Sequence, residues 1–220
     1  MDFVQLGGPV VGILLCLSVV AAALIGLKTF GFFYCSVGSH RNVKRSIQLW
    51  NEGKRSESIE SLSGTKSSLG KVLHLTMQRL VSKAVDKEVI EEEVSTVAIR
   101  ELHEHQRGFR ALEAITQIAP LLGLFGTVLG MIDAFQKLQS AGNSVDPSIL
   151  AGGIWVALLT TAAGLAVAMP ISLALTWFET RLDDEKVAIQ TMTAELLGNH
   201  AISTDEIGYS NDEIEASYAT

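Results

Sequence analysis

The chain has 220 residues, of which 48% are hydrophobic and 19% are charged, and its mean hydropathy is +0.31. A soluble enzyme rarely separates apolar from charged segments so strongly, so the composition favours a membrane protein with a sizeable soluble portion. The net charge of -7 is concentrated towards the C-terminus and gives no sign of nucleic-acid binding.

An uncharged apolar segment near the N-terminus predicts a first transmembrane helix over residues 10–34. No charge occurs from Val10 to Leu27, and apolar residues resume after Lys28, which gives about 20 to 24 residues, enough to cross a bilayer. Residues 1–9 contain no Lys or Arg, whereas a secretory signal peptide begins with positive charge. We therefore expect this external N-terminus and the first span to be retained.

Residues 35–113 predict a helical domain outside the membrane. Its first part, Asn42–Leu62, is typical of short helices with a break near Gly53, and the Ser/Gly-rich stretch Ser61–Gly70 separates it from the rest. After that stretch, apolar residues recur at three- and four-residue spacing, with no proline before Pro120.

This spacing predicts one long amphipathic helix that continues into the second span. From Lys87 to Phe135 it would measure about 70 Å at 1.5 Å per residue. Its apolar stripe must be covered by other helices of the chain or by neighbouring copies, so we expect an oligomer.

Two further uncharged stretches complete an all-α membrane protein with three transmembrane helices and long cytoplasmic helical extensions. The flanking charges are Glu113 and Asp133 for the second span, and Asp146 and Glu179 for the third. The predicted boundaries are 114–135 for the second span, 136–148 for an external loop, 149–178 for the third span, 179–202 for a cytoplasmic helical extension and 203–220 for an acidic flexible tail.

Basic residues set the expected orientation, because they favour the cytoplasmic side. The loop 136–148 contains only Lys137, whereas several basic residues follow the first span closely. The N-terminus is therefore expected on the periplasmic side, and the main domain and C-terminus in the cytoplasm. The basic residues after the first span are Arg41, Lys44, Arg45, Lys54 and Arg55.

Small and hydroxyl-bearing residues recur at helical spacing in the second and third spans. Such residues let helices approach closely, and an intramembrane hydroxyl marks either a helix contact or a conduction path. No ionisable residue lies in the middle of a span; Asp133, at the outer end of the second, is the nearest. The candidates are Thr127, Thr160 and Thr161 for a proton pathway, with Ser172 as a weaker one, Asp133 as an interfacial residue, and Gly123, Gly126, Gly130, Gly164 and Ala168 for helix packing.

The sequence predicts no enzyme, no cofactor and no metal site. His103 and His105 are two residues apart, so they lack the four-residue spacing of a helical zinc pair. Together with the acidic run Glu91 to Glu93, they fit a solvated helix face. The segment GLFGTVLG lacks the Lys-Ser/Thr pair of a phosphate-binding loop, and no GxSxG motif occurs.

Two motifs in this order resemble the ExbB/TolQ/MotA family of proton-channel proteins, and its ExbB branch most. They are APLLGLFGTVLGMIDAFQ, residues 119–136, and GGIWVALLTTAAGLAVAMP, residues 152–170. The resemblance implies a ring-forming subunit of the bacterial inner membrane, a pentamer in ExbB relatives, whose second and third spans line a pore. It implies an ExbD- or TolR-like single-span partner that carries the protonatable aspartate, and a TonB-like protein that energises outer-membrane transport.

By position, Thr127 and Thr161 match the family's pore threonines, which implies that they bind the partner carboxyl group or a water wire. Val156 stands where relatives commonly have glutamate, so Asp133 or a partner residue would replace that charge, or this branch conducts differently. A TolQ-like envelope-maintenance motor and a non-conducting membrane scaffold remain alternatives.

Overall fold

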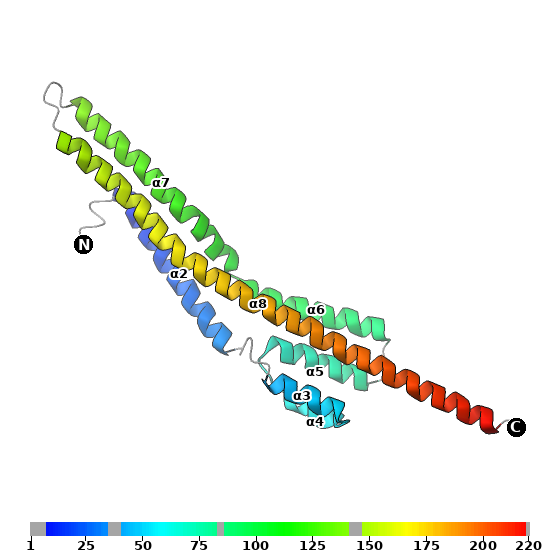
Figure 1. Ribbon diagram of the computed structural model, residues 1–220. Coiled ribbons are helices and arrows are strands. Elements are labelled where there is room, and N and C mark those ends of the chain that lie inside the picture. The colour runs from blue at the N-terminus through cyan, green and yellow to red at the C-terminus, as the bar shows by residue number, and fades with distance from the viewer. Residues whose placement is uncertain (1–7, 35–40, 83–85, 141–146, 219–220) are drawn as a thin grey trace. The chain divides into compact units, whose positions relative to one another are not determined.

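The structure is a computed structural model that describes the backbone of residues 8–34, 41–82, 86–140 and 147–218. Within these ranges every element is a helix. Side chains are described except for those of residues 33–34, 149 and 199–218. The helices are α2 (Gly8–Tyr34), α3 (Arg41–Asn51), α4 (Arg55–Leu62), α5 (Ser68–Val81), α6 (Lys87–Gln106), α7 (Phe109–Ser140) and α8 (Pro147–Tyr218) (Figure 1).

Three of these helices are long and apolar enough to cross a membrane, which confirms the predicted number of spans. The candidate spans lie within residues 8–32, 87–140 and 150–198. The predicted external loop is shorter in the structure, because α7 runs on to Ser140 and α8 begins at Pro147. Proline suits the first position of a helix, since its fixed backbone angle is helical and its missing N–H would have no partner there.

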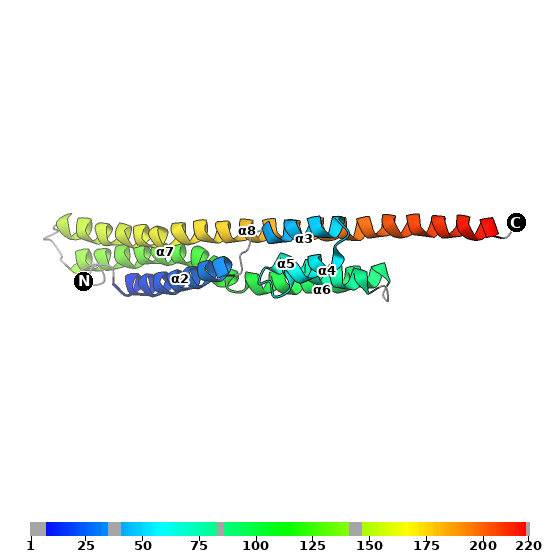
Figure 2. The same ribbon diagram turned by 90° about the horizontal axis from the view of Figure 1, so that it is seen from below.

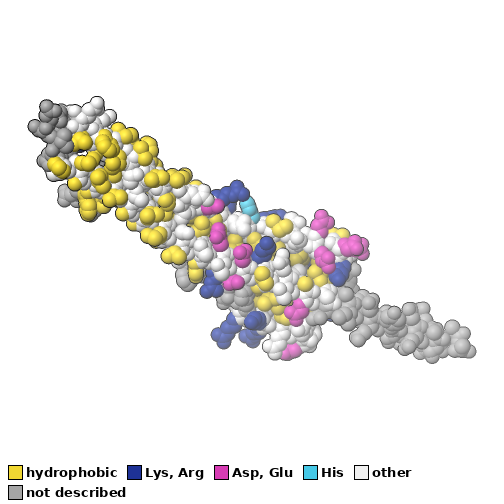
Figure 3. Space-filling model, turned by 45° about the horizontal axis from the view of Figure 1, so that its top comes forward, with side chains coloured by type: hydrophobic (Ala, Val, Ile, Leu, Met, Phe, Trp, Pro, Cys, Tyr) yellow, Lys and Arg dark blue, Asp and Glu magenta, His cyan; other side chains and the backbone are white. Residues whose placement is uncertain are grey.

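The chain divides into two compact units. The first, here called the apolar unit, contains residues 1–30 and 106–179, and the second, the polar unit, contains residues 31–105 and 180–220. Figure 3 shows hydrophobic side chains covering the visible face of the apolar unit, and most of the charged side chains on the polar unit.

The apolar unit consists of α2, α7 and the first part of α8, which lie side by side in both ribbon views (Figures 1 and 2). Its buried cluster takes Val10 and Leu14 from α2, Ala119 from α7 and Ala168 from α8. Large side chains point away from the bundle: Leu173 is 75% exposed, as expected for a helix surrounded by lipid or by other subunits.

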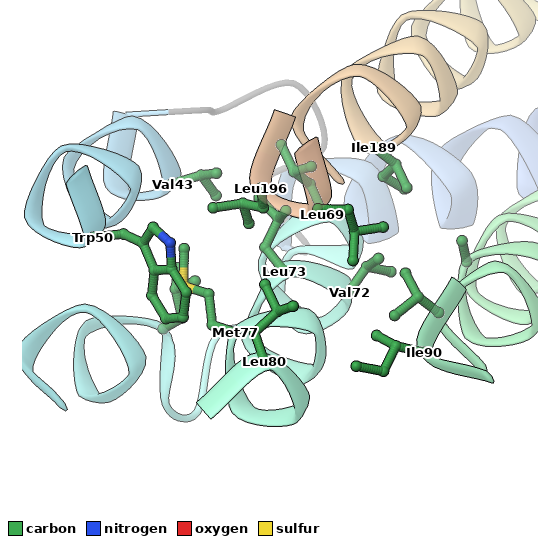
Figure 4. Packing of buried hydrophobic residues seen from close by; sticks show 14 residues of the cluster. Val43, Trp50, Leu69, Val72, Leu73, Met77, Leu80, Ile90, Ile189 and Leu196 are labelled. Atoms are coloured by element: carbon green, nitrogen blue, oxygen red, sulfur yellow. The ribbon is translucent and has the colours of Figure 1, made fainter. Parts of the chain in front are cut away.

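The polar unit packs α3 to α6 and the second part of α8 around one hydrophobic core. Trp50 and Met77 lie together in it, and Leu196 of α8 packs beside Leu73 of α5 (Figure 4). The core residues are Val43, Trp50, Leu62, Leu69, Val72, Leu73, Met77, Leu80, Ile90, Val94, Ala98, Ile189, Leu196 and Leu197.

Breaks between helices fall partly where the sequence predicts them. Gly53 separates α3 from α4 with φ +82°, a left-handed conformation that glycine adopts without strain, and this confirms the predicted break. The prediction of an unbroken helix from Lys87 to Phe135 is wrong. Gly108, with φ +90°, ends the helical path between α6 and α7.

The C-terminal segment 203–218 has helical backbone as part of α8, where the sequence predicts a flexible tail. Its flexibility and its side chains fall outside what the structure describes, so the tail stays a prediction.

Candidate functional site

Helices α7 and α8 approach each other closely along their small residues. Gly123 of α7 faces Gly164 of α8: a Cβ atom built on Gly123 would lie 3.3 Å from the Gly164 Cα and 2.9 Å from the carbonyl oxygen of Thr160. Only glycine permits backbones this close. The structure thus places these two predicted packing glycines opposite each other.

The other predicted packing residues lie on the same side of α7 or beside α2. A Cβ on Gly126 would meet the Thr160 hydroxyl at 2.5 Å, and one on Gly130 would meet the Ala157 Cβ at 3.1 Å. Ala168 lies instead in the buried cluster shared with α2. Gly126 and Gly130 therefore extend the α7–α8 contact.

Two hydroxyl groups share one carbonyl at the centre of this contact. The Thr160 hydroxyl is buried and donates to the carbonyl oxygens of Ala157, at 2.7 Å, and Gly123, at 3.1 Å. Thr161, which is half-buried, donates to the same Gly123 oxygen at 3.3 Å. Each hydroxyl has one proton, which these bonds use, so the hydroxyl oxygens of Thr160 and Thr161 can only accept further hydrogen bonds.

Thr127 lies apart from this pair. Its hydroxyl donates within α7 to the Leu124 carbonyl oxygen at 2.6 Å. It lines a shallow hollow on α7 together with Val128, Met131, Ile132, Phe135, Gln136 and Gln139. The structure therefore brings Thr160 and Thr161 together on the Gly123 carbonyl and leaves Thr127 outside this pair, while Ser172 is exposed further along α8.

A cleft opens at the end of the apolar unit that bears the α7–α8 connection; we call it the loop-end cleft. Asp133 and Lys137 form an ion pair there, with 2.7 Å between Oδ2 and Nζ. The lining residues are Gly8, Pro9, Val10, Gly126, Leu129, Gly130, Asp133, Lys137, Ser148, Gly152, Gly153, Trp155, Val156 and Thr160.

His105 and Glu93 of α6 contact side chains of other helices. His105 packs edge-on against Phe32 with ring centroids 5.9 Å apart, and Glu93 pairs with Arg79 at 2.6 Å. No three His, Cys, Asp or Glu side chains converge as metal ligands in the part of the chain that the structure describes.

Glu185 was not singled out by the sequence, where it follows Asp183 and Asp184 in an acidic run. In the structure its side chain is 1% exposed, and its Oε1 atom accepts a hydrogen bond from the Leu69 backbone N–H at 3.2 Å. A carboxylate at the start of α5 also interacts favourably with that helix's dipole. Its place in the run gives no signal of this burial.

The sequence model of the MotA/TolQ/ExbB proton channel family matches residues 65–191, more than half of the chain. The chain belongs to this family. The match includes α5 to α7, the first part of α8 and every candidate residue of the α7–α8 contact.

Curated relatives of this MotA/TolQ/ExbB protein support the ExbB branch. The chain is 42% identical, over 39% of its length, to the biopolymer transport protein exbB1 of Vibrio cholerae. It is 29% identical, over 73% of its length, to the biopolymer transport protein ExbB of Pseudomonas putida. The ExbB of Neisseria gonorrhoeae is 45% identical over 30% of the chain. The matches cover 37%, 51% and 30% of these relatives, so the chain spans about half of their length or less.

Proposed function

We propose that this multi-pass membrane protein is the ring subunit of an inner-membrane proton channel that uses the proton motive force to energise outer-membrane transport. The observation that carries the proposal is the family match, which includes both helices of the hydroxyl-lined contact. The proposed assembly is a homo-oligomer, a pentamer by analogy with ExbB relatives, with an ExbD/TolR-like partner and a TonB-like protein. Its N-terminus is periplasmic, and its polar unit is cytoplasmic.

The partner is needed because the described spans carry no acid at their centres. Asp133 lies near the end of α7, seven residues before Ser140 on a helix that rises 1.5 Å per residue. A carboxyl group that carries protons across the membrane must therefore come from another chain. Thr127 and Thr161 would meet it with hydroxyl oxygens whose protons already bond backbone carbonyls.

A non-conducting scaffold is the second candidate, and one observation favours it. The Thr160 and Thr161 hydroxyls both donate to Gly123 within the same chain, as expected if they serve only to join α7 to α8. A TolQ-like envelope-maintenance motor would use the same channel chemistry for another purpose.

Proton flux of the parent complex separates the channel from the scaffold, and Thr161→Val tests the part of the Thr161 hydroxyl in that flux. The substitution keeps the side-chain volume and leaves the Thr160 bond to Gly123 in place, so the complex should assemble. Proton flux should fall about tenfold or more, the equivalent of one hydrogen bond to a charged group. Flux is measured with a pH-sensitive dye in liposomes that contain the complex and its single-span partner.

Thr161→Ser is the matched control, because it keeps the hydroxyl, and it should retain most of the flux. An assembled Thr161→Val complex with undiminished proton flux would exclude a role for this hydroxyl in conduction, whereas a parent complex that assembles but carries no proton flux would support the scaffold.

A further inference from the structure

The loop-end cleft has a volume of about 720 Å³ within the apolar unit. Its walls come from the first turn of α2, the second half of α7 and the first turns of α8. Liquid water takes about 30 Å³ per molecule, so the space exceeds that of a few isolated water molecules.

Glycines line the cleft on both helices, Gly152 on α8 and Gly126 on α7. A Cβ atom on Gly152 would meet nothing within 4 Å, so this residue borders open space. At the other end, a Cβ on Gly126 would lie 2.5 Å from the Thr160 hydroxyl oxygen, so a larger side chain there would collide with that hydroxyl. Along α8, the cleft is lined by Gly152, Val156 and Thr160, which follow one another at four-residue spacing.

Polar groups occur at both ends of the cleft. The Asp133 and Lys137 side chains are 60% and 62% exposed, and they place charge at the wide end. The Thr160 side chain, which is 2% exposed, forms part of the wall at the deep end. Water enters a cavity when several polar partners line it, whereas purely apolar cavities stay dry.

We propose that the loop-end cleft is a water-filled inlet inside a single subunit, which brings water from the compartment at the α7–α8 connection to the Thr160 hydroxyl. Val156 lies on its wall, between Gly152 and Thr160 on α8. The inference rests on the proposed function for the statement that protons use this water. The accessibility of the cleft itself can be measured without any flux.

Cysteine labelling tests the inlet in the assembled complex, after Cys16→Ser and Cys35→Ser remove the native thiols. Val156→Cys and Gly152→Cys should react with a charged, membrane-impermeant thiol reagent added on the side of the α7–α8 connection. Labelling after SDS unfolding confirms that each thiol is intact. A Val156→Cys protein that resists the reagent when folded, while Gly152→Cys reacts, would show a dry or lipid-filled cleft and overturn the proposal.

A second variant shows which route the reagent takes. Gly152→Phe, added to Val156→Cys, places a ring in the cleft and should slow labelling about tenfold or more. Ala151→Phe is the matched control, because Ala151 is exposed and does not line the cleft, so labelling should stay within about twofold. Unchanged labelling with Gly152→Phe would mean that water reaches Val156 by another path, and would also overturn the proposal.

The outcomes separate this inference from the proposed function. An accessible Val156→Cys in a complex without proton flux would leave the inlet in place and reject the channel. A closed cleft in a complex that conducts protons would reject the inlet and leave the proposed channel in place.

Discussion

Glu185 is a buried carboxylate that joins two helices of the polar unit. It belongs to α8, and through the Leu69 N–H it holds the first turn of α5, where backbone N–H groups have no helical partners. Ser68 and Lys71 of the same turn bond a second acid, Glu101, at 3.3 Å and 2.8 Å. Carboxylates from two helices thus fix the start of α5.

Glu185→Ala should destabilise the protein, because it leaves the buried Leu69 N–H without this acceptor. The cost of an unsatisfied buried group is about 1–3 kcal/mol, which should appear as a lower melting temperature of the full complex in detergent. Glu185→Gln keeps an acceptor oxygen and should lose less.

Glu195→Ala is the control, since Glu195 is exposed on the same helix and surface changes alter stability by about 0.5 kcal/mol or less. A Glu185→Ala protein as stable as the Glu195→Ala protein would show that the carboxylate does not hold α5.

Residue-level patterns predict which side chains are unusual, but not which groups they meet. Thr127, Thr160 and Thr161 stand out because each is a hydroxyl in an apolar helix. Their different partners depend on where Gly123 and Leu124 present their carbonyl oxygens, which three-dimensional packing decides. Glu185 could not be predicted for the same reason, because its chain neighbours are ordinary surface acids.

At the scale of elements, the α7–α8 contact depends on glycine only where backbones meet. A Cβ on Gly164 would lie 2.6 Å from the Ala119 carbonyl oxygen. A backbone atom cannot relieve this collision by changing rotamer, as a flexible side chain could. Gly152, on the same helix, has no neighbour within 4 Å of its Cβ position.

Gly164→Ala should therefore force α7 and α8 apart, whereas Gly152→Ala should be tolerated. We expect the first variant to lose about 1–3 kcal/mol by overpacking, and the second to stay near the parent stability. Thermal unfolding of the two purified complexes side by side measures the difference. Equal melting temperatures would contradict the close contact between the helices.

The break at Gly108 shows what helical periodicity leaves undecided. Apolar spacing runs through residues 87–135, and an isolated glycine lowers helix propensity by only about 1 kcal/mol, so the pattern predicts continuity. Gly108 instead adopts φ +90°, and the Lys28 side chain lies beside it, with its Cε atom 3.5 Å from the Cβ position. The apolar spacing of residues 87–135 carries no information about this contact with α2, so it could not predict the break.

For the whole molecule, the number of spans and the all-helical class follow from hydropathy alone, because a bilayer requires long apolar helices. The cleft could not be predicted, since it depends on how three helices come together. Large apolar side chains remain exposed on the apolar unit, including Leu121 at 63%, Trp155 at 66% and Leu173 at 75%.

We expect these exposed faces to join copies of the chain and a single-span partner. Co-purification from a membrane that contains both proteins should give a complex whose mass equals several 23.6 kDa chains plus the partner, measured by native mass spectrometry. A monomer that carries only lipid, obtained under mild extraction, would contradict the ring.

In the proposed channel, the direction of the threonine hydrogen bonds has a consequence for the charge state of an incoming acid. Thr127 and Thr161 both donate to carbonyls of their own chain, so their oxygens offer electron pairs to an acid that approaches them. A neutral carboxylic acid can donate to such oxygens, whereas its anion would be repelled by them. In the proposed channel, loading a proton would let the partner's acid settle against these helices, and losing it would expel the acid.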